Sequence, residues 1–303
     1  MAFQTGTVNH SIELLDTLRV FLVTQGWAVD KTQDITDGKQ VDISKDNHFM
    51  HFRAINEPPS NGFYRYQANS IAMVMSDAAD TTTEFQKLNP NTKQIPIIDT
   101  IQKGPFKYWF FHLENPLVVF CILEYEADRF EFLMFGSILK YSDWTGGQFF
   151  GASWTIGQRH QRIMNTGPFQ DNSSPREGTT FLHAEVDRFK WLTCGEFSED
   201  GYRLVRGMNF WHRELMDQSP SSFNGLSTMI PVQLFAERDD GFFSPIGELE
   251  HVRYVNILPY SPGQIIQLGA AQWMIFPFHH KGPKEHPDYD GTQHLGYAVR
   301  VIK

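Results

Sequence analysis

Cysteine is scarce in this sequence: its 303 residues include only two, Cys121 and Cys194. The two form no CxxC pair, and Cys121 lies within the apolar stretch LVVFCILEY. Disulfide scaffolds and thiolate metal sites need several cysteines at short, regular spacings. We therefore expect both residues to be buried free thiols in a protein that folds in a reducing compartment.

Long apolar runs are also missing. The longest run spans Leu117–Leu123, whereas a membrane-spanning helix needs about 20 apolar residues. The first residues, MAFQTGTVNH, lack the basic-then-apolar order of a secretion signal. With 41% hydrophobic and 20% charged residues, the composition is that of a globular chain. These features predict a protein that neither enters a membrane nor is secreted.

Positive charge is in deficit, because the formal net charge is −9 and the pI is about 5.7. An acidic chain has no long-range attraction for a phosphate backbone. Basic and aromatic residues do alternate in FYRY and HVRYV. On a chain of this charge, such alternation is more typical of a sheet surface than of base stacking. Sequence-specific nucleic-acid binding is not expected.

The signatures of common catalytic sites are absent. No GxSxG motif occurs, and its nearest approaches are Gly151–Trp154 and Gly225–Thr228. The segment Thr145–Gly151 has the glycines of a phosphate-binding loop but neither its lysine nor a following helix. We therefore predict a non-enzymatic protein with no catalytic residues and no cofactor.

One enzymatic alternative stays open, because the two acids of a glycoside hydrolase can come from distant positions in the chain. Five acids are candidates for such a pair: Glu124, Glu126, Asp128, Asp239 and Asp240. Their positions are more typical of exposed charges at strand ends and turns.

The densest histidine cluster consists of His279, His280, His286 and His294. A zinc site needs three or four ligands in a tetrahedral arrangement, and this spacing fits no zinc signature. The adjacent pair would also point to opposite faces of a strand. We therefore predict a solvated, proline-interrupted loop and no metal site.

Aromatic residues are abundant instead: 26 Phe, 10 Tyr and 7 Trp make up 14% of the chain. This density is typical of sheets with large cross-strand contacts, or of extensive subunit interfaces. One helix is expected from about Ser11 to Gln25, because apolar residues recur there at helical spacing. Asn9 or Ser11 would cap its start, and Gly26 would end it.

After Trp27 the pattern changes to short aromatic and β-branched runs separated by turn residues, which is typical of antiparallel sheets. The expected strand segments are HFMHFRAI, FYRYQANSIAMVM, YWFFHLENPLVVFCILEY, RFEFLMFGSILKY, MIPVQLFAER, HVRYVNIL, QIIQLGAAQWMIFPFH and LGYAVRVI. The predicted fold class is mostly β (α+β), with antiparallel, β-sandwich-like sheets and one N-terminal amphipathic helix.

A break in apolar density divides the chain. Residues 167 to 180, GPFQDNSSPREGTT, gather Ser, Pro, Gly and charge. We therefore expect an N-terminal domain over 1–166, containing the helix and β structure, and a C-terminal β domain over 181–303. The segment between them fits either a linker or an interface loop. No internal repeat is present, which disfavours solenoids and propellers.

Three stretches resemble a known group of proteins. They are TGTVNHSIELLDTLRVFLVTQGWAV, KYWFFHLENPLVVFCILEYEADRFEFLMFGSILKYSDWTGGQFFG, and ERDDGFFSPIGELEHVRYVNILPYSPGQIIQLGAAQWMIFPFHHKG with the closing GYAVRVI. Together they are similar to virion structural proteins of tailed bacteriophages, from the head, neck and tail genes. The resemblance spans most of the chain, and its motifs are structural, not catalytic.

The resemblance implies a structural role in assembly. The protein would form part of a tail ring at the tube end, on the baseplate or neck side. Its partners would be copies of itself and other tail proteins of the tube, sheath, baseplate or neck. It would be assembled in the host cytoplasm and located in the virion tail. The alternative is a β-sandwich module that binds glycan through exposed aromatics, as an adhesion protein does.

Four aromatic residues are candidates for the interface of such a ring. They lie in the glycine-rich segment WTGGQFFGASW, which can present side chains on a loop. The residues are Trp144, Phe149, Phe150 and Trp154. The competing interpretation is that they fill the core of their own domain.

Overall fold

A computed structural model describes residues 1–36, 38–55, 69–85, 88, 95–99, 104–155, 169, 180–187, 189–193, 203–207, 220–281 and 294–302. The described residues are 61% strand and 7% helical, which confirms the predicted mostly β fold with one helix near the N-terminus. No helix in these ranges is long and apolar enough to cross a membrane.

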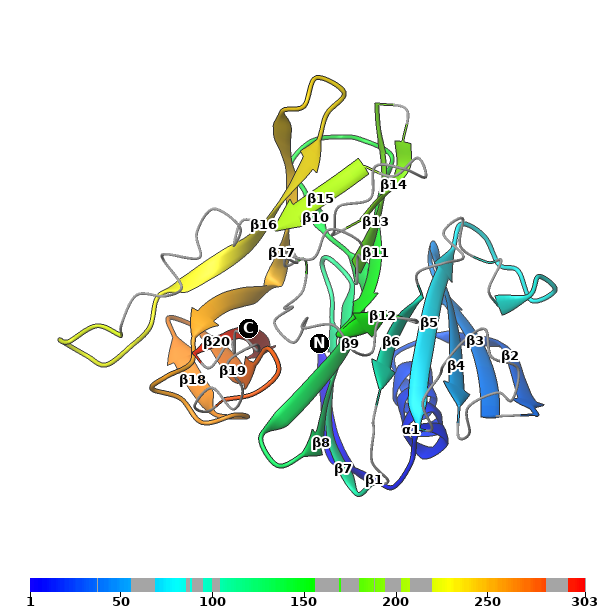
Figure 1. The fold of residues 1–303 in the computed structure, drawn as a ribbon, viewed down its shortest axis with the longest axis horizontal. Coiled ribbons are helices and arrows are strands. Elements are labelled where there is room, and N and C mark those ends of the chain that lie inside the picture. Colours follow the sequence, from blue (N-terminus) through cyan, green and yellow to red (C-terminus); the bar gives the residue numbers. More distant parts are fainter. Residues whose placement is uncertain are drawn as a thin grey trace, which may run out of the picture.

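The strands form two sheets (Figure 1). The smaller has six strands in the order β12 (Trp154–Thr155), β6 (Pro96–Asp99), β5 (Ser70–Ser76), β4 (His48–Ile55), β3 (Gly38–Lys45) and β2 (Ala28–Ile35). The larger has 14 strands. Its path runs β1 (Ala2–Val8), β7 (Phe106–Leu113), β8 (Val118–Glu126), β9 (Arg129–Ser137), β11 (Gly146–Ala152), β13 (Thr180–Val186), β14 (Phe189–Thr193), β15 (Arg203–Gly207), β16 (Met229–Glu237), β17 (Phe243–Asn256), β20 (Leu295–Ile302), β19 (Ala271–Pro277) and β18 (Ile265–Leu268), while β10 (Leu139–Lys140) pairs with β17. Among the described pairs, only β14 with β15 is parallel.

The single helix, α1, spans Ser11–Thr24 and begins where the sequence predicts. Its N-cap is His10, not Asn9 or Ser11: the His10 Nδ1 atom accepts the Glu13 backbone N–H at 3.2 Å. Asn9 instead donates its backbone N–H to Glu13 Oε2 at 2.7 Å, so the two interactions together resemble a capping box. Gly26, with φ +84, follows the helix end as expected.

Strands β7, β8 and β9 form a central layer that is buried on both faces. Along β7, Trp109 and Phe111 pack into one core cluster, with residues of β16, β17, β19 and β20. The alternate residues Tyr108 and Phe110 pack into a second cluster, with α1 and strands β3 to β5. The large sheet therefore folds back on itself on one side, while the small sheet and α1 cover the other. This explains why the sequence of these strands is apolar almost throughout.

Several strands differ from the sequence prediction in extent. The stretch Tyr108–Tyr125 is a hairpin of β7 and β8, turning at Glu114 to Leu117. Residues Ala2–Val8, for which the sequence predicted no strand, pair with β7 as β1. The predicted strands at His48–Ile55 and Leu295–Ile302 match β4 and β20 residue for residue.

Residues 167 to 180 lie outside the described residues, except for Phe169 and Thr180. Phe169 is fully buried, with its ring centroid 5.4 Å from that of Phe149. Strand β11 pairs with β13 across this segment, so both predicted domains contribute strands to one sheet. The division of the chain into two domains stays a prediction.

Candidate functional site

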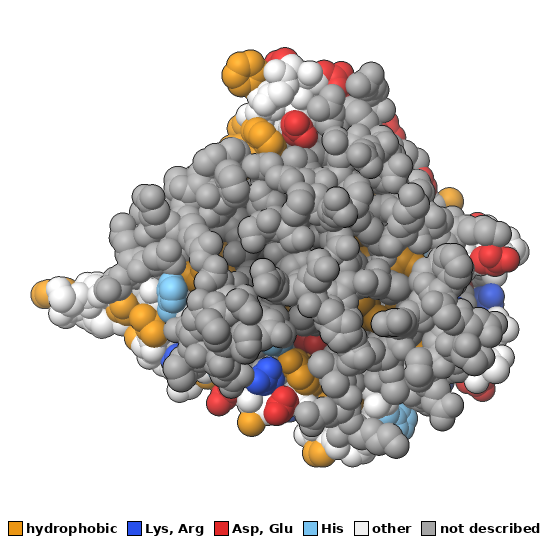
Figure 2. All heavy atoms as spheres, viewed as in Figure 1, with side chains coloured by type: hydrophobic (Ala, Val, Ile, Leu, Met, Phe, Trp, Pro, Cys, Tyr) orange, Lys and Arg blue, Asp and Glu red, His pale blue; other side chains and the backbone are white. Residues whose placement is uncertain are grey.

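Two turns project from the body and expose a phenylalanine each. The Phe223 turn, Pro220–Ser227, ends the projection on the left of Figure 1, and the Phe242 turn, Arg238–Phe242, ends the β16–β17 hairpin at the top. The side chain of Phe223 is 94% exposed and that of Phe242 is 73% exposed. Figure 2 shows hydrophobic side chains at the tips of both projections. They are the two most exposed large hydrophobic side chains in the described part of the chain.

The Phe223 turn is held together by its own hydrogen bonds. The Ser221 N–H donates to the Leu226 carbonyl at 2.9 Å, and the Gly225 N–H donates to the Ser221 carbonyl at 2.8 Å. The Ser227 N–H donates to the hydroxyl of buried Tyr260 at 2.9 Å, which fixes the turn to the body. The phenyl ring is therefore held in solvent by a turn with a defined, hydrogen-bonded conformation.

The Phe242 turn is braced by an ion pair to a neighbouring hairpin. Arg238 donates from Nε and Nη2 to the two carboxylate oxygens of Asp187, at 2.9 and 2.6 Å. Asp187 lies in the turn between β13 and β14, and it also accepts the Asp239 N–H at 3.2 Å. This bidentate geometry is the strong form of a surface ion pair, so the hairpin tip is positioned relative to the rest of the large sheet.

An exposed phenyl ring on a positioned turn can serve as an anchor for another protein. Aromatic side chains that enter a pocket of the partner contribute much of the binding energy of an interface. A turn that is already ordered loses little conformational entropy when it binds.

The predicted interface residues lie elsewhere. Phe149 and Phe150 are fully buried, in the two core clusters on either side of β11. They belong to a strand between β9 and β13 and not to a surface loop, so their side chains fill the protein's own core. Trp144 is half-buried against the core, and its Nε1 donates to the Ile246 carbonyl at 3.4 Å. The backbone of Trp154 forms β12, while its side chain lies outside the described part.

Three histidines of the cluster are described, His279, His280 and His294, and the His294 carbonyl accepts the Ile257 N–H at 2.6 Å. His279 is buried, with Nδ1 3.1 Å from the Phe130 carbonyl oxygen, and His280 forms an isolated bridge to Arg129. His286 lies outside the described residues. No group of three or more His, Cys, Asp or Glu that could hold a metal occurs within the described ranges.

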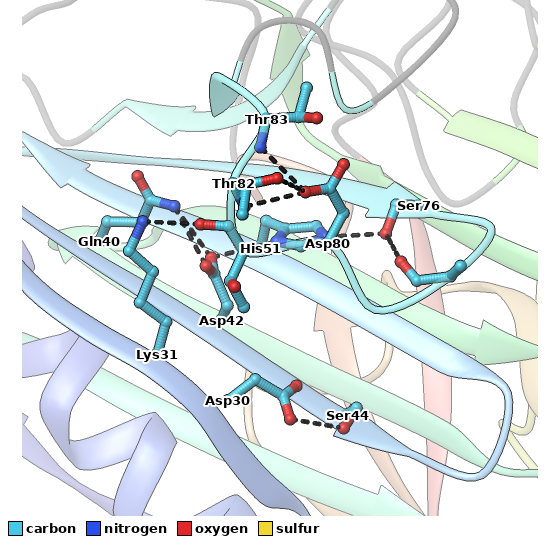
Figure 3. A network of polar contacts seen from close by, with 12 residues as sticks. Asp30, Lys31, Gln40, Asp42, Ser44, His51, Ser76, Asp80, Thr82 and Thr83 are labelled. Atoms are coloured by element: carbon cyan, nitrogen blue, oxygen red, sulfur yellow. Dashed lines mark hydrogen bonds and ion pairs between the residues drawn. The ribbon is translucent and has the colours of Figure 1, made fainter.

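A chain of buried polar side chains crosses the outer face of the small sheet (Figure 3). The His51 Nδ1 atom lies 3.1 Å from Asp42 Oδ1, and its Nε2 atom lies 2.8 Å from Ser76 Oγ. Gln40 Nε2 donates to both carboxylate oxygens of Asp42, at 3.1 and 3.2 Å. Asp, His and Ser thus stand in the order used by serine hydrolases.

The hydrogen-bond directions in this chain oppose nucleophilic catalysis. The single proton of the Ser76 hydroxyl is donated to the Ala78 carbonyl at 2.7 Å. His51 Nε2 must then donate to Ser76, whereas a general base must accept the serine proton. Asp42, His51 and Ser76 are also all buried.

The polar chain instead ties a covering segment to the sheet. Ser76 and Ala78 begin the segment that continues through Asp80, and the Lys31 ammonium donates to the Thr81 carbonyl at 3.0 Å from β2. Asp80 Oδ1 accepts the backbone N–H groups of Thr82 and Thr83, both at 2.9 Å. Hydrogen bonds from these two threonines hold the pKa of the Asp80 carboxyl well below its usual range.

The sequence analysis predicted neither the Phe223 turn nor the polar chain at His51, although the sequence contains a signal for each. The Phe223 turn reads PSSFNGLS, in which the phenylalanine is isolated among turn-forming residues. Asp42 and His51 become neighbours only through the register of β3 with β4, which places them opposite each other. That register is not visible in a single sequence without pairing the strands.

A third feature is an open groove of about 470 Å³ between β1 and α1. Its lining residues are Gln4, His10, Ile12, Glu13, Asp16, Thr17 and Val20. Val20 is exposed on the outer surface of the helix. The groove is therefore apolar in part, with carboxylates along it.

Comparison with protein-family models and with curated protein sequences finds no match to this chain. The function is therefore inferred from the two projecting turns, the buried polar chain and the sequence resemblance.

Proposed function

We propose that the protein is a non-enzymatic structural subunit of a tailed-phage virion, forming part of a ring at the tube end of the tail. The observation that carries the proposal is the ordered Phe223 turn, which holds a phenyl ring almost entirely in water. Such an arrangement is costly for an isolated molecule and useful to a subunit that contacts a neighbour. The three stretches of sequence resemblance supply the virion context.

The chemistry of the described residues supports a role without turnover. Ser76 is buried, and its hydroxyl proton is directed away from His51. The free thiol of Cys121 is buried as well, and burial raises its pKa far above the usual range. A thiol in that state is not a nucleophile.

The partners we propose are copies of the same chain and other tail proteins, from the tube, sheath, baseplate or neck. Two projections in different directions suit a subunit with more than one neighbour (Figure 1). A repeated head-to-tail contact closes into a ring when the rotation between subunits divides a full turn. The protein would be located in the virion tail, after assembly in the host cytoplasm.

A glycan-binding module is the second candidate, and it requires exposed aromatic faces. Four tryptophans with described side chains are buried: Trp27, Trp109, Trp191 and Trp273. Trp144 is half-buried. The exposed aromatics at the projecting tips are single phenylalanines, on separate turns, so they form no shared platform for a sugar. The structural role is therefore the better supported of the two.

The experiment is to measure the mass of the purified full-length protein by mass photometry over a range of concentrations, followed by electron microscopy of the assembled fraction. We expect one closed oligomer of fixed copy number, with interfaces above about 1,000 Å² per contact. A protein that stays monomeric at the highest soluble concentration, and binds a glycan array instead, would require the adhesion alternative.

A further inference from the structure

We propose that the Phe223 turn of one subunit inserts into the groove between β1 and α1 of a second copy of the same chain. The inference rests on the proposed ring function and adds the contact that would build the ring. It joins the most exposed apolar side chain among the described residues to a partly apolar groove.

The first argument is position. The Phe223 turn forms the left end of the molecule in Figure 1, and α1 lies in the lower right part, beneath the small sheet. A turn and a groove that lie so far apart cannot meet within one chain. Two copies can bring them together, and the pair then still offers one free turn and one free groove. Such a contact is head-to-tail and leads to a ring or a filament.

The second argument is the apolar match. The groove offers Ile12 and Val20 on one stripe of α1, because positions eight apart fall on the same helix face. On the groove side, Val20 is 53% exposed in the isolated chain. On the turn side, Leu226 near Phe223 is 45% exposed. A phenyl ring seated against this stripe would remove apolar surface from water on both partners. The groove has a volume of about 470 Å³ and is open to solvent, so a phenyl ring would lie along its floor and stay accessible from one side.

The third argument is charge, and it selects between the two turns. The groove carries the carboxylates of Glu13 and Asp16. The Phe242 turn includes Asp239 and Asp240, so it would bring like charges to these acids. Residues Pro220–Ser227 carry no charged side chain. The Phe223 turn can therefore enter the groove without that repulsion.

The groove is also already ordered. Asp16 accepts from Lys39 Nζ at 2.7 Å, and Glu13 accepts from the Asn9 N–H at 2.7 Å. Both walls are regular secondary structure, since Gln4 lies on β1 and donates to the Tyr108 hydroxyl at 3.0 Å. A rigid turn entering a rigid groove requires little rearrangement of either partner.

The test uses two full-length variants that each disable one side of the contact. Phe223→Ser removes the anchor and leaves the groove, while Val20→Glu blocks the groove and leaves the anchor. Both positions are exposed, so both variants should keep the circular dichroism spectrum and melting temperature of the wild type. Phe242→Ser is the matched control, because it removes an exposed phenylalanine from the other turn.

Each single variant should weaken assembly by about 10- to 100-fold in sedimentation or mass photometry, the effect of exposing one buried aromatic side chain. Phe242→Ser should assemble like the wild type. A mixture of Phe223→Ser and Val20→Glu should give 1:1 heterodimers and nothing larger, because only one functional turn and one functional groove remain to each pair.

The outcomes separate the two proposals. A wild-type protein that never assembles contradicts the ring function and this contact together. A wild type that assembles, with both variants assembling equally well or with no heterodimer in the mixture, leaves the ring function standing and overturns the contact. An effect of Phe242→Ser larger than that of Phe223→Ser would also overturn it.

Discussion

His51 and Asp42 lie directly opposite each other on β4 and β3, with 3.1 Å between His51 Nδ1 and Asp42 Oδ1, and both are buried. Removing Asp42 leaves the buried Nδ1 atom of His51 and the amide of Gln40 without the carboxylate that they contact. We expect Asp42→Ala to lower the free energy of unfolding by about 1 to 3 kcal/mol in urea titration. Asp30→Ala is the control: Asp30 is exposed and accepts only from Ser44 in the described contacts, so its effect should stay within about 0.5 kcal/mol. Equal effects of the two substitutions would contradict the structural role of the buried pair.

Ser76 should not react as a nucleophile, despite its place beside His51. Its hydroxyl donates to the Ala78 carbonyl, and the side chain is buried. We expect no labelling of the native protein by a fluorophosphonate probe, as read by intact-protein mass spectrometry. A known serine hydrolase in the same tube checks the probe. Covalent label at Ser76 that disappears in Ser76→Ala would contradict the non-enzymatic proposal.

Stability should fall as the pH decreases from about 6.5 to about 4, because burial and the nearby Lys45 charge lower the pKa of His112 to about 4. In the unfolded chain His112 binds a proton near pH 6.5, whereas in the folded chain it does so only near pH 4. The contribution of His112 to the free energy of unfolding is therefore complete above about pH 6.5 and is lost as the pH falls to about 4. The loss from His112 reaches about 3 kcal/mol. Burial also lowers the pKa of His48 and of His251, and both act in the same direction.

The measurement is urea unfolding at pH 7.5, 5.5 and 4.5, for the wild type and for His112→Gln. The variant should show a shallower decline with pH, whatever its absolute stability. His280→Gln serves as the control and should keep the wild-type slope. An unchanged slope in His112→Gln would mean that His112 does not control this pH dependence.

Gly136 should be intolerant of any side chain. Its φ is +143, and a Cβ added there would lie 2.2 Å from the Leu117 carbonyl oxygen, which is backbone and cannot move aside. We expect Gly136→Ala to destabilise the protein by more than about 3 kcal/mol or to prevent soluble expression. Gly225→Ala is the matched control: its φ is +68, but no atom lies within 4 Å of the added Cβ. It should cost about 1 kcal/mol of backbone strain. Thermal unfolding of both variants decides the comparison.

Local sequence patterns were sufficient to predict the helix and the strands that have clear periodicity or clear boundaries. The helix at Ser11–Thr24 and the strand at His48–Ile55 carry clear periodicity or clear boundaries, and both lie where they were expected. The predicted cap residue was wrong, because the side chain of His10, which is not a preferred cap residue, accepts the Glu13 backbone N–H. Phe149 and Phe150 were ambiguous because glycines beside them fit a loop and a bulged strand equally well.

The order of the strands and the arrangement of the layers could not be predicted from one sequence. Pairing of β1 with β7 joins residues that are about a hundred positions apart, and local preferences do not encode such pairings. The polar chain at His51 depends on the registers of β4 with β3 and with β5, which local preferences do not fix either. The Phe223 turn is different, because the hydrogen bonds of Ser221 and Gly225 are local. Only the structure shows that the phenyl ring is 94% exposed.

The double burial of β7, β8 and β9 has a consequence for synthesis of the protein. Their second covering layer, from β16 to β20, is encoded downstream, so the ribosome adds Met229–Ile302 only after the central strands have emerged. At usual elongation rates that delay is on the order of 10 s. During this interval Val118–Leu123, VVFCIL, presents an uncharged, proline-free, β-prone segment of the kind that stacks between nascent chains. Yield in a recombinant host should therefore depend on temperature and chaperone supply more than on the stability of the finished fold.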